Sequence, residues 1–189
     1  RNRNNLGLTI SLNRAFSLVK GEYIARQDAD DVSMSQRLDK QVAFLEHHPS
    51  VGLLGTAYEY ISSDGQFLQA IEEPTEDCVL QKQLLDHNCF SHGSVMIRRE
   101  CLDCVGLYRP HLRMAQDYDL WLRIAEHCKI ANLPDHLYEY RFAPDAMSLQ
   151  RTELQLTYIK LIQELARTRR RNGCEKLPLK ADGSIDLAM

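Results

Sequence analysis

Two clusters of aspartates are the side chains of this sequence best suited to carry out chemistry. The first, Asp28-Ala29-Asp30-Asp31, follows residues 22–26, which are predicted to form a short strand. Ligands of open α/β sheets bind beyond the carboxyl ends of the strands, and clustered carboxylates repel one another unless a cation or water screens them. Their hard oxygens suit Mg²⁺ or Mn²⁺. The alternative is a solvated acidic turn in which Asp31 or Ser33 caps the next helix.

The second cluster, Gln116-Asp117-Tyr118-Asp119, lies just before, or in the first turn of, a predicted helix. A carboxylate held at a helix start can stay ionised and act as a general base toward a hydroxyl group. The alternative is that these aspartates only cap the helix and offset its dipole. A lone histidine, His92, precedes a predicted strand at residues 93–97, and its spacing alone assigns it no role. The helix itself is predicted from apolar residues at helical spacing: Leu120, Trp121, Ile124, Ala125 and Cys128.

Helical and extended patterns alternate along the chain, which predicts an α/β layered fold. Residues 51–61 and 67–71 are predicted strands joined by an Asp64-Gly65 hairpin turn. Residues 129–131 and 137–142 are predicted to be two further, separate strands. Ser33 and Gln36 resemble a capping box before a helix that ends ahead of Pro49. A long amphipathic helix is predicted around residues 154–165, and the polar tail after Asn172 is expected to be loosely held.

The composition is that of one globular domain. The chain has 189 residues, and its 23 basic and 26 acidic side chains give a net charge of −3, so nucleic acid is not an expected partner. No stretch approaches the ~20 apolar residues that span a bilayer, and no secretory signal is visible at the start. The six cysteines are expected to be free thiols. Cys101 and Cys104 are spaced as C-x-x-C, but a zinc site would need further ligands, and none is evident at ligand spacing.

Taken in order, the motifs of residues 4–150 resemble those of family 2 glycosyltransferases. Each motif is weak by itself, and the resemblance depends on their order and spacing. The segments that carry it are Asn5-Leu6-Gly7-Leu8, Leu12-Asn13, residues 21–31, residues 37–41, residues 51–56, Asp64-Gly65, residues 92–98, residues 106–109, residues 117–123 and Tyr140-Arg141. The resemblance implies a GT-A fold, a Rossmann-like mixed sheet flanked by helices, here with a C-terminal amphipathic helix.

The resemblance also implies a role for each matched residue. Asp28 and Asp30 correspond to a D-x-D motif that holds Mg²⁺ or Mn²⁺ against the diphosphate of a nucleotide sugar, with Asp30 the better placed for direct contact. Asp117 corresponds to the base that deprotonates the acceptor hydroxyl, with inversion at the anomeric carbon. The donor-binding residues it implies are Asp28, Asp30, Arg26 and Asn13, and the residues near the acceptor are His92, Gly93 and Trp121.

The sequence departs from the family pattern at three places. The family's opening strand and nucleobase-reading aspartate are missing, so the chain is expected to be a partial domain. Gln116 stands where the family often has glutamate before the base. Ala143 stands where the family often has a histidine that assists the metal or the diphosphate, and His136 is a substitute for it. The expected organisation is a glycosyltransferase domain over residues 1–150, an amphipathic helix over residues 151–171 and a polar tail over residues 172–189.

The expected partners are a nucleoside-diphosphate sugar and a saccharide or lipid-linked acceptor, in cell-surface polysaccharide or lipopolysaccharide synthesis. The expected location is the cytoplasm or the inner face of the membrane. Four arginines near the end of the amphipathic helix either compensate its carboxyl terminus or contact an anionic membrane: Arg167, Arg169, Arg170 and Arg171. The alternatives to a catalytic transferase are a non-catalytic nucleotide-sugar-binding module or fragment, and a sugar-phosphate nucleotidylyltransferase. The latter would need a glycine-rich phosphate loop, which this chain does not show.

Overall fold

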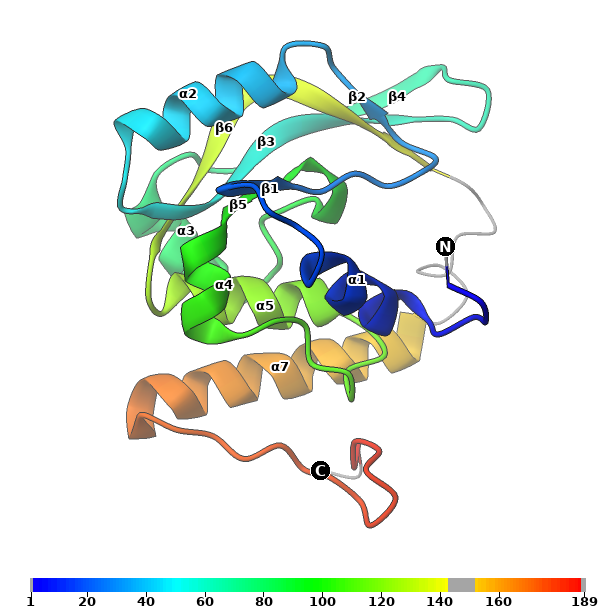
Figure 1. The fold of residues 1–189 in the computed structure, drawn as a ribbon, viewed down its shortest axis with the longest axis vertical. Coiled ribbons are helices and arrows are strands. Elements are labelled where there is room, and N and C mark those ends of the chain that lie inside the picture. Colours follow the sequence, from blue (N-terminus) through cyan, green and yellow to red (C-terminus); the bar gives the residue numbers. More distant parts are fainter. Residues whose placement is uncertain (1, 143–151, 188–189) are drawn as a thin grey trace.

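The computed structural model describes residues 2–142 and 152–187 as one mixed sheet with helices on both faces (Figure 1). The fold class expected from the sequence, α/β with a C-terminal helix, is confirmed. The elements are α1 Leu8–Phe16, β1 Tyr23–Ala25, β2 Val32–Ser33, α2 Arg37–His47, β3 Val51–Ile61, β4 Phe67–Ile71, α3 Asp77–Gln83, the 3₁₀ turn η1 His92–Ser94, β5 Met96–Arg98, α4 Arg99–Val105, α5 Gln116–Ala125, β6 Lys129–Arg141 and α7 Thr152–Asn172.

The sheet is built around β3, the longest apolar stretch of the sequence. Its strand order is β1-β5-β3-β6-β2, and β4 pairs with the carboxyl-terminal end of β3. The β3–β6 pair is parallel, whereas β1, β2, β4 and β5 pair antiparallel with their neighbours. Because the first seven residues of β3 are buried, this strand reads as a continuous apolar run with no alternation, as expected for a strand covered on both faces.

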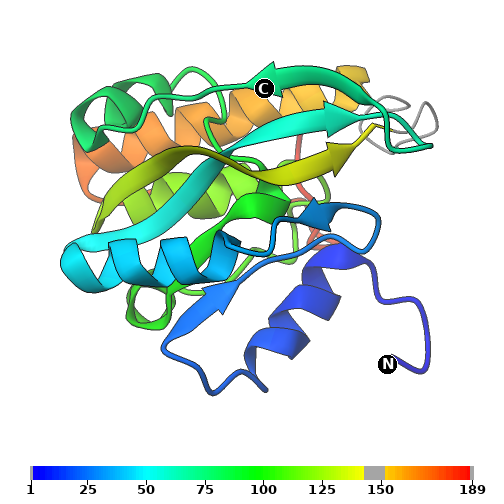
Figure 2. The same cartoon turned by 90° about the horizontal axis from the view of Figure 1, so that it is seen from above.

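Helices cover the two faces of the sheet unequally (Figure 2). Helix α2 alone packs on one face, through a small cluster that includes Leu45, Leu54 and Leu137. The other face carries the main core, in which Trp121 of α5 and Ile162 of α7 are fully buried. Helix α5 therefore lies between the sheet and α7, and its first turn is held in place from several sides.

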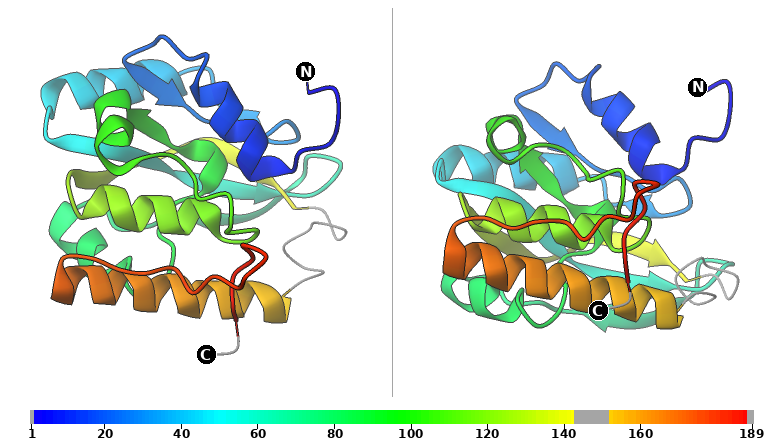
Figure 3. Two further views of the ribbon diagram at one scale, coloured as in Figure 1. Left: turned by 60° about the horizontal axis from the view of Figure 1, so that its bottom comes forward. Right: turned by 90° about the horizontal axis from the view of Figure 1, so that it is seen from below.

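The segment after α7 is not loosely held, so that prediction is wrong. It turns back along α7 and α5 (Figure 3), and Leu179 and Ile185 form a small hairpin bridge. The Ile185 side chain is buried in the main core. The Glu175 carboxylate is also buried and forms ion pairs with Arg109 and Arg169. The polar composition of this segment gives no sign that Ile185 is buried or that Glu175 forms ion pairs.

Two further predictions about local structure are wrong for physical reasons. Residues 129–141 form one strand, β6, because the register shift that places Leu133 opposite Thr56 and His136 opposite Ala57 lets Pro134 and Asp135 bulge outward. A bulge accommodates a proline, which cannot donate a ladder hydrogen bond. Ser33 is not part of a capping box, because it belongs to β2 and pairs with Tyr138.

The described residues contain neither a disulfide bond nor a helix that could cross a membrane. All six cysteines are free, as predicted, although Cys78, Cys104 and Cys174 are exposed rather than buried. None of the helices in residues 2–142 and 152–187 is long and apolar enough to cross a bilayer.

Candidate active site

The acidic loop leaves β1 at Arg26, whose backbone is fixed from both sides. Its amide donates to Val95 O (2.9 Å), and its carbonyl accepts from the Arg37 guanidinium (2.9 Å). The Arg26 side chain is buried and forms an ion pair with Asp28. Its Nε has no hydrogen-bond partner among the described residues. A buried guanidinium with an unused N–H is suited to bind a further anion.

Within the aspartate cluster, Asp31 has a structural role. Its carboxylate accepts hydrogen bonds from the Tyr138 hydroxyl (2.6 Å) and from the Arg141 amide (2.8 Å). Burial raises the pKa of Asp31, and these two hydrogen bonds oppose that rise. The Tyr138 hydroxyl also accepts from the Asp28 amide (3.2 Å). Asp31 therefore fastens the acidic loop to the end of β6.

With Asp31 occupied by these bonds, the other two carboxylates of the loop are those of Asp28, which is partly exposed beside Arg26, and Asp30. Asp30 is exposed, and within the described part of the chain its carboxylate makes no hydrogen bond or ion pair. The Arg141 Nε donates to Asp30 O (2.8 Å) and so holds the backbone under that carboxylate. Carboxylate oxygens on a fixed backbone fit Mg²⁺ or Mn²⁺, which prefer hard oxygen ligands.

Ala143 stands where the family has a histidine, and His136 is the residue expected to substitute for it. Ala143 lies outside the described residues. His136 is partly buried in β6, and its Nε2 has no hydrogen-bond partner among the residues described. Its service as a substitute ligand stays a prediction.

Asp117 and Asp119 lie in the first turn of α5, but their environments differ. The helix is entered through Ala115, which adopts a left-handed conformation (φ 51°) that is costly for a residue with a Cβ. Asp117 is partly exposed and accepts one hydrogen bond, from the Asn88 amide (3.1 Å). Asp119 is fully buried and forms ion pairs with Arg109 and Arg123. Of the two carboxylates, Asp117 is therefore the one that could meet a substrate.

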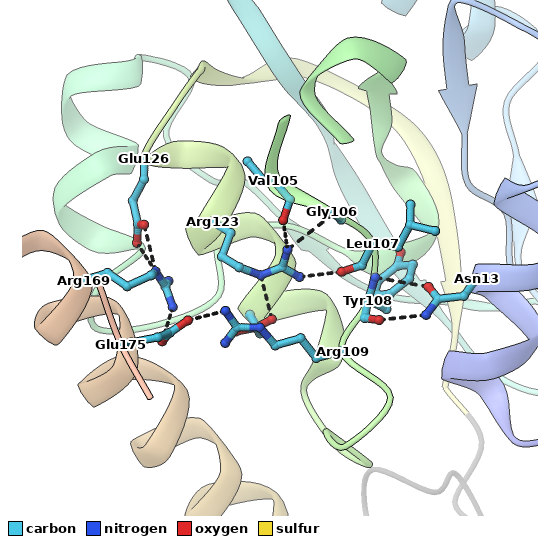
Figure 4. Close-up of polar contacts among 11 residues, drawn as sticks. Asn13, Val105, Gly106, Leu107, Tyr108, Arg109, Arg123, Glu126, Arg169 and Glu175 are labelled. Atoms are coloured by element: carbon cyan, nitrogen blue, oxygen red, sulfur yellow. Dashed lines mark hydrogen bonds and ion pairs between the residues drawn. The ribbon is translucent and has the colours of Figure 1, made fainter. Parts of the chain in front are cut away.

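The buried Asp119 is the centre of a polar network that stabilises this end of α5, and Figure 4 shows its partners Arg109 and Arg123 with the groups that they bind in turn. Arg123 bridges Asp119 (2.9 Å) to the carbonyls of Val105 (2.7 Å) and Leu107 (2.8 Å), which precede Tyr108. Arg109 links Asp119 (3.1 Å) to Glu175 of the C-terminal segment. The network joins α5, the connection after α4 and the tail.

Asn13 of α1 extends this arrangement on the opposite side of the network (Figure 4). Its side-chain amide donates to Tyr108 O (2.7 Å) and accepts from Tyr108 N (3.1 Å). Both ends of the amide are thus occupied by the Tyr108 backbone. The structure shows Asn13 positioning Tyr108, and the predicted contact of Asn13 with the donor stays a prediction.

His92 is close to residues of both the acidic loop and α5. Its Nε2 is 2.9 Å from the Tyr108 hydroxyl, and its ring makes an edge contact with Trp121 (centroids 5.9 Å apart). Burial lowers the pKa of His92, while Asp117 raises it, Arg26 lowers it and Asp28 raises it. Burial raises the pKa of Tyr108, so this phenol stays protonated beside the imidazole.

The structure thus brings together residues that are far apart in the sequence. Arg26 and Asp28 at the end of β1 and Asp117 at the start of α5 all act electrostatically on His92 and on Tyr108. Arg26, Asp28 and the partly exposed Asp117 are therefore all near His92. This arrangement can hold an anionic leaving group at one side and deprotonate a hydroxyl at the other.

The other two residues predicted near an acceptor are buried. Gly93 packs directly against the Tyr138 hydroxyl, so a Cβ there would overlap that side chain, and its carbonyl accepts from Arg37 (2.7 Å). Trp121 is 0% exposed and lies behind His92, with its Nε1 unpaired among the described residues. Both residues support His92 in this structure, and their direct contact with an acceptor stays a prediction.

The sequence assigned no role to three positioning residues: Asn88, Tyr138 and Tyr108, the last of which lies within the recognised residues 106–109. Each is a common residue type whose partner is distant in the chain, so composition and spacing gave no signal. Tyr138 comes two residues before the recognised Tyr140-Arg141 pair, which is the one cue that could have drawn attention to it.

Known proteins share both the fold and the sequence pattern. The solved structure of the mannosyltransferase PcManGT from Pyrobaculum calidifontis, in complex with GDP-Man and Mn²⁺, superposes with a TM-score of 0.60 at 18% identity, covering 93% of this chain and 47% of that one. The amylovoran biosynthesis glycosyltransferase AmsE of Erwinia amylovora is 34% identical over 166 residues, 83% of this chain and 61% of its own length. The O-antigen biosynthesis glycosyltransferase WbnJ of Escherichia coli is 33% identical over 137 residues, 71% of this chain and 53% of its own length.

The fold is that of the GT-A glycosyltransferases. The sequence model of glycosyl transferase family 2 matches residues 1–106, and the chain belongs to that family. The chain spans only about half to three-fifths of the length of the two curated relatives named above.

Proposed function

We propose that this chain carries the catalytic site of an inverting glycosyltransferase, which moves a sugar from a nucleoside-diphosphate sugar to an acceptor hydroxyl. The observation that carries the proposal is that Asp117, a partly exposed carboxylate oriented by Asn88, and the ion-paired Arg26 and Asp28 all influence the pKa of one histidine, His92. A base and an anion-binding loop are the two parts that a single-displacement sugar transfer requires.

On the donor side, the acidic loop binds the diphosphate. Asp28 and Asp30 supply the oxygen ligands for Mg²⁺ or Mn²⁺, which offsets the charge on the leaving diphosphate when it is bound. Arg26 holds Asp28 through their ion pair and adds a positive charge beside the loop. Tyr138 fixes the loop by its bonds to Asp31 and to the Asp28 amide.

On the acceptor side, Asp117 takes the proton from the attacking hydroxyl. Its Oδ2 is oriented by Asn88, whose Oδ1 in turn accepts from the Phe90 amide (3.2 Å), so the amide cannot turn without losing a bond. The hydroxyl oxygen attacks the anomeric carbon from the face opposite the leaving diphosphate, which inverts the configuration. No covalent enzyme intermediate is formed, so no protein nucleophile is needed.

The acceptor is proposed to lie against His92, which Trp121 and Gly93 support from behind. Its chemistry is that of a saccharide, free or lipid-linked, in cell-surface polysaccharide or lipopolysaccharide synthesis. The name of the O-antigen glycosyltransferase relative supports this setting.

Peripheral contact with the inner face of the membrane is proposed to involve only part of the arginine cluster. Arg169 is bound by the carboxylates of Glu126 and Glu175 and is nearly buried. Arg167 and Arg171 stay substantially exposed, although Asp86 and Glu164 pair with them. Sedimentation with vesicles that contain anionic lipid tests this contact: replacing Arg167 and Arg171 with alanine should weaken it, and replacing Arg169 should act through stability alone.

Calorimetric titration with UDP, GDP and dTDP, each with and without Mn²⁺, tests the donor site and names the nucleotide. We expect metal-dependent binding of one nucleotide that is lost in Asp30→Ala. Asp39→Ala, which removes an exposed carboxylate of α2, is the matched control and should bind normally.

The titration, together with an assay of sugar transfer, distinguishes the transferase from a non-catalytic binding module. Nucleotide binding without sugar transfer in any acceptor assay would favour a non-catalytic binding module. No nucleotide binding at all, by a folded protein, would contradict the proposal. The titration should be repeated on a longer chain that includes any residues upstream of Arg1, so that a weak signal is traced to its cause.

A further inference from the structure

Three potential metal ligands of different chemistry meet away from the acidic loop. Glu73 lies between β4 and α3, and His87 and Cys89 follow α3. One ligand atom from each, a carboxylate oxygen, an imidazole nitrogen and the Cys89 Sγ, all lie within 4.8 Å of one another. The nearest approach between the Glu73 Oε2 and the His87 Nε2 is 3.9 Å. That distance is too long for a hydrogen bond.

The three side chains differ in how far they are open to solvent. Cys89 is 1% exposed, Glu73 is partly buried, and His87 is open to solvent. Burial raises the pKa of Glu73, against the opposing effect of His87. Burial also raises the pKa of the Cys89 thiol to about 12, with a smaller contribution from Glu73.

We propose that Glu73, His87 and Cys89 form a Zn²⁺ site. A set of one sulfur, one nitrogen and one oxygen is typical of zinc, which takes all three ligand types and is usually tetrahedral. Mg²⁺ and Mn²⁺ prefer oxygen ligands, so this site and the acidic loop select different metals. Three protein ligands leave a fourth position for water. Binding forms the Zn–S bond and breaks the Cys89 S–H bond, and the proton passes to solvent without any redox change.

The backbone around the three ligands is already fastened as such a site requires. The Asn132 side-chain amide of β6 donates to Pro74 O (3.1 Å) and to Cys89 O (3.2 Å). One amide group thereby holds the residue after Glu73 and the Cys89 ligand itself. The ligands thus come from two chain segments that the sheet brings into a fixed relation, and metal binding would need little rearrangement.

The zinc site would also stabilise the segment that orients the base. Asn88, which donates to the Asp117 carboxylate, stands between His87 and Cys89. A metal that ligates both neighbours would limit the movement of Asn88. This consequence for catalysis rests on the proposed function, whereas metal binding itself does not.

Cobalt(II) substitution tests the site, because a Co²⁺–thiolate bond gives an intense near-ultraviolet charge-transfer band and tetrahedral Co²⁺ gives strong visible bands. We expect the purified, metal-free protein to bind one Co²⁺ with both signals, and one equivalent of Zn²⁺ to displace it. Cys89→Ser should remove the charge-transfer band. His87→Ala, at an exposed position that should not disturb folding, should weaken Zn²⁺ binding by more than about 100-fold, since loss of an outer-shell partner alone costs 10–100-fold.

Cys104→Ser is the matched control, because it removes an exposed thiol of α4 and should leave the cobalt spectrum unchanged. Absence of any Co²⁺–thiolate band in the wild-type protein, or its survival in Cys89→Ser, would overturn the site. The spectrum does not depend on sugar transfer. A normal spectrum in an inactive protein would therefore count against the proposed function alone, and an active protein without the band would count against the zinc site alone.

Discussion

The side-chain amide of Asn88 donates a 3.1 Å hydrogen bond to the Asp117 carboxylate. Asn88→Ala removes this bond and leaves the donor site intact. We expect kcat to fall by about 10-fold, the value of one hydrogen bond to a charged group, with KM for the nucleotide sugar unchanged. Steady-state kinetics at saturating acceptor measures both constants.

Asn88→Asp is the sharper companion variant. It places a second carboxylate beside Asp117 and so raises the pKa of the base by like-charge repulsion. The loss of activity should then be larger than in Asn88→Ala and should recover partly at higher pH. Equal losses at every pH would show that Asn88 does not orient an ionised base.

Asp119 has a structural role that Asp117 does not share. Asp119→Asn would leave the buried Arg123 guanidinium without its carboxylate partner. We expect unfolding to become about 3 kcal/mol easier, as for other broken buried ion pairs. Thermal denaturation should show a marked drop in Tm for Asp119→Asn and almost none for Asp117→Asn. If the two variants were equally stable, the network around Asp119 would not hold α5.

Gly93 is required by the close approach of Tyr138. Gly93→Ala would push the Tyr138 hydroxyl away from Asp31 and from the Asp28 amide. We expect a loss of about 1–3 kcal/mol of stability from overpacking together with weaker nucleotide binding. Gly21→Ala, at an exposed glycine, is the control. Normal nucleotide affinity in a folded Gly93→Ala protein would contradict the coupling between Tyr138 and the loop.

His92 should make the protein less stable in mild acid. Burial holds the pKa of His92 below its ordinary value of 6.5, in spite of the nearby Asp117 and Asp28 carboxylates. Between the folded pKa and 6.5 the unfolded chain binds more protons, so stability rises with pH across that window and is lost as pH falls through it.

Denaturant titrations from pH 7.5 to pH 5 measure this dependence. His92→Gln should flatten the curve, whereas His127→Gln, at an exposed position just after the end of α5, should not. An unchanged slope in His92→Gln would show that other groups cause the acid sensitivity.

The elements that could be predicted from sequence are those set by local patterns. The bounds predicted for β3, Val51–Ile61, are those of the structure, because an apolar run is enclosed by a proline on one side and a hairpin turn on the other. The apolar residues at helical spacing around Trp121 likewise predicted α5. The two-strand prediction for β6 failed because the bulge at Pro134 depends on pairing with β3, which no local pattern reveals.

Some residues of the candidate site could also be predicted from the sequence, and others could not. Asp28, Asp30 and Asp117 could be singled out because they stand in clusters within the segments that resemble family 2 glycosyltransferases. Asn88 and Tyr138 could not, because their partners lie 29 and 110 residues away along the chain. The C-terminal segment was misjudged for a related reason, since only the folded structure brings Glu175 between Arg109 and Arg169.

Asp117 is proposed to be the base of a sugar transfer, and the donor is proposed to bind at the acidic loop. The most direct test of this proposal is the release of nucleoside diphosphate from the bound donor in the presence of acceptor, compared between wild type and Asp117→Asn. We expect equal donor affinity by calorimetry and a loss of about 10²–10⁴-fold in the rate, the range for general-base catalysis. A variant that binds donor and transfers sugar at the wild-type rate would contradict the account.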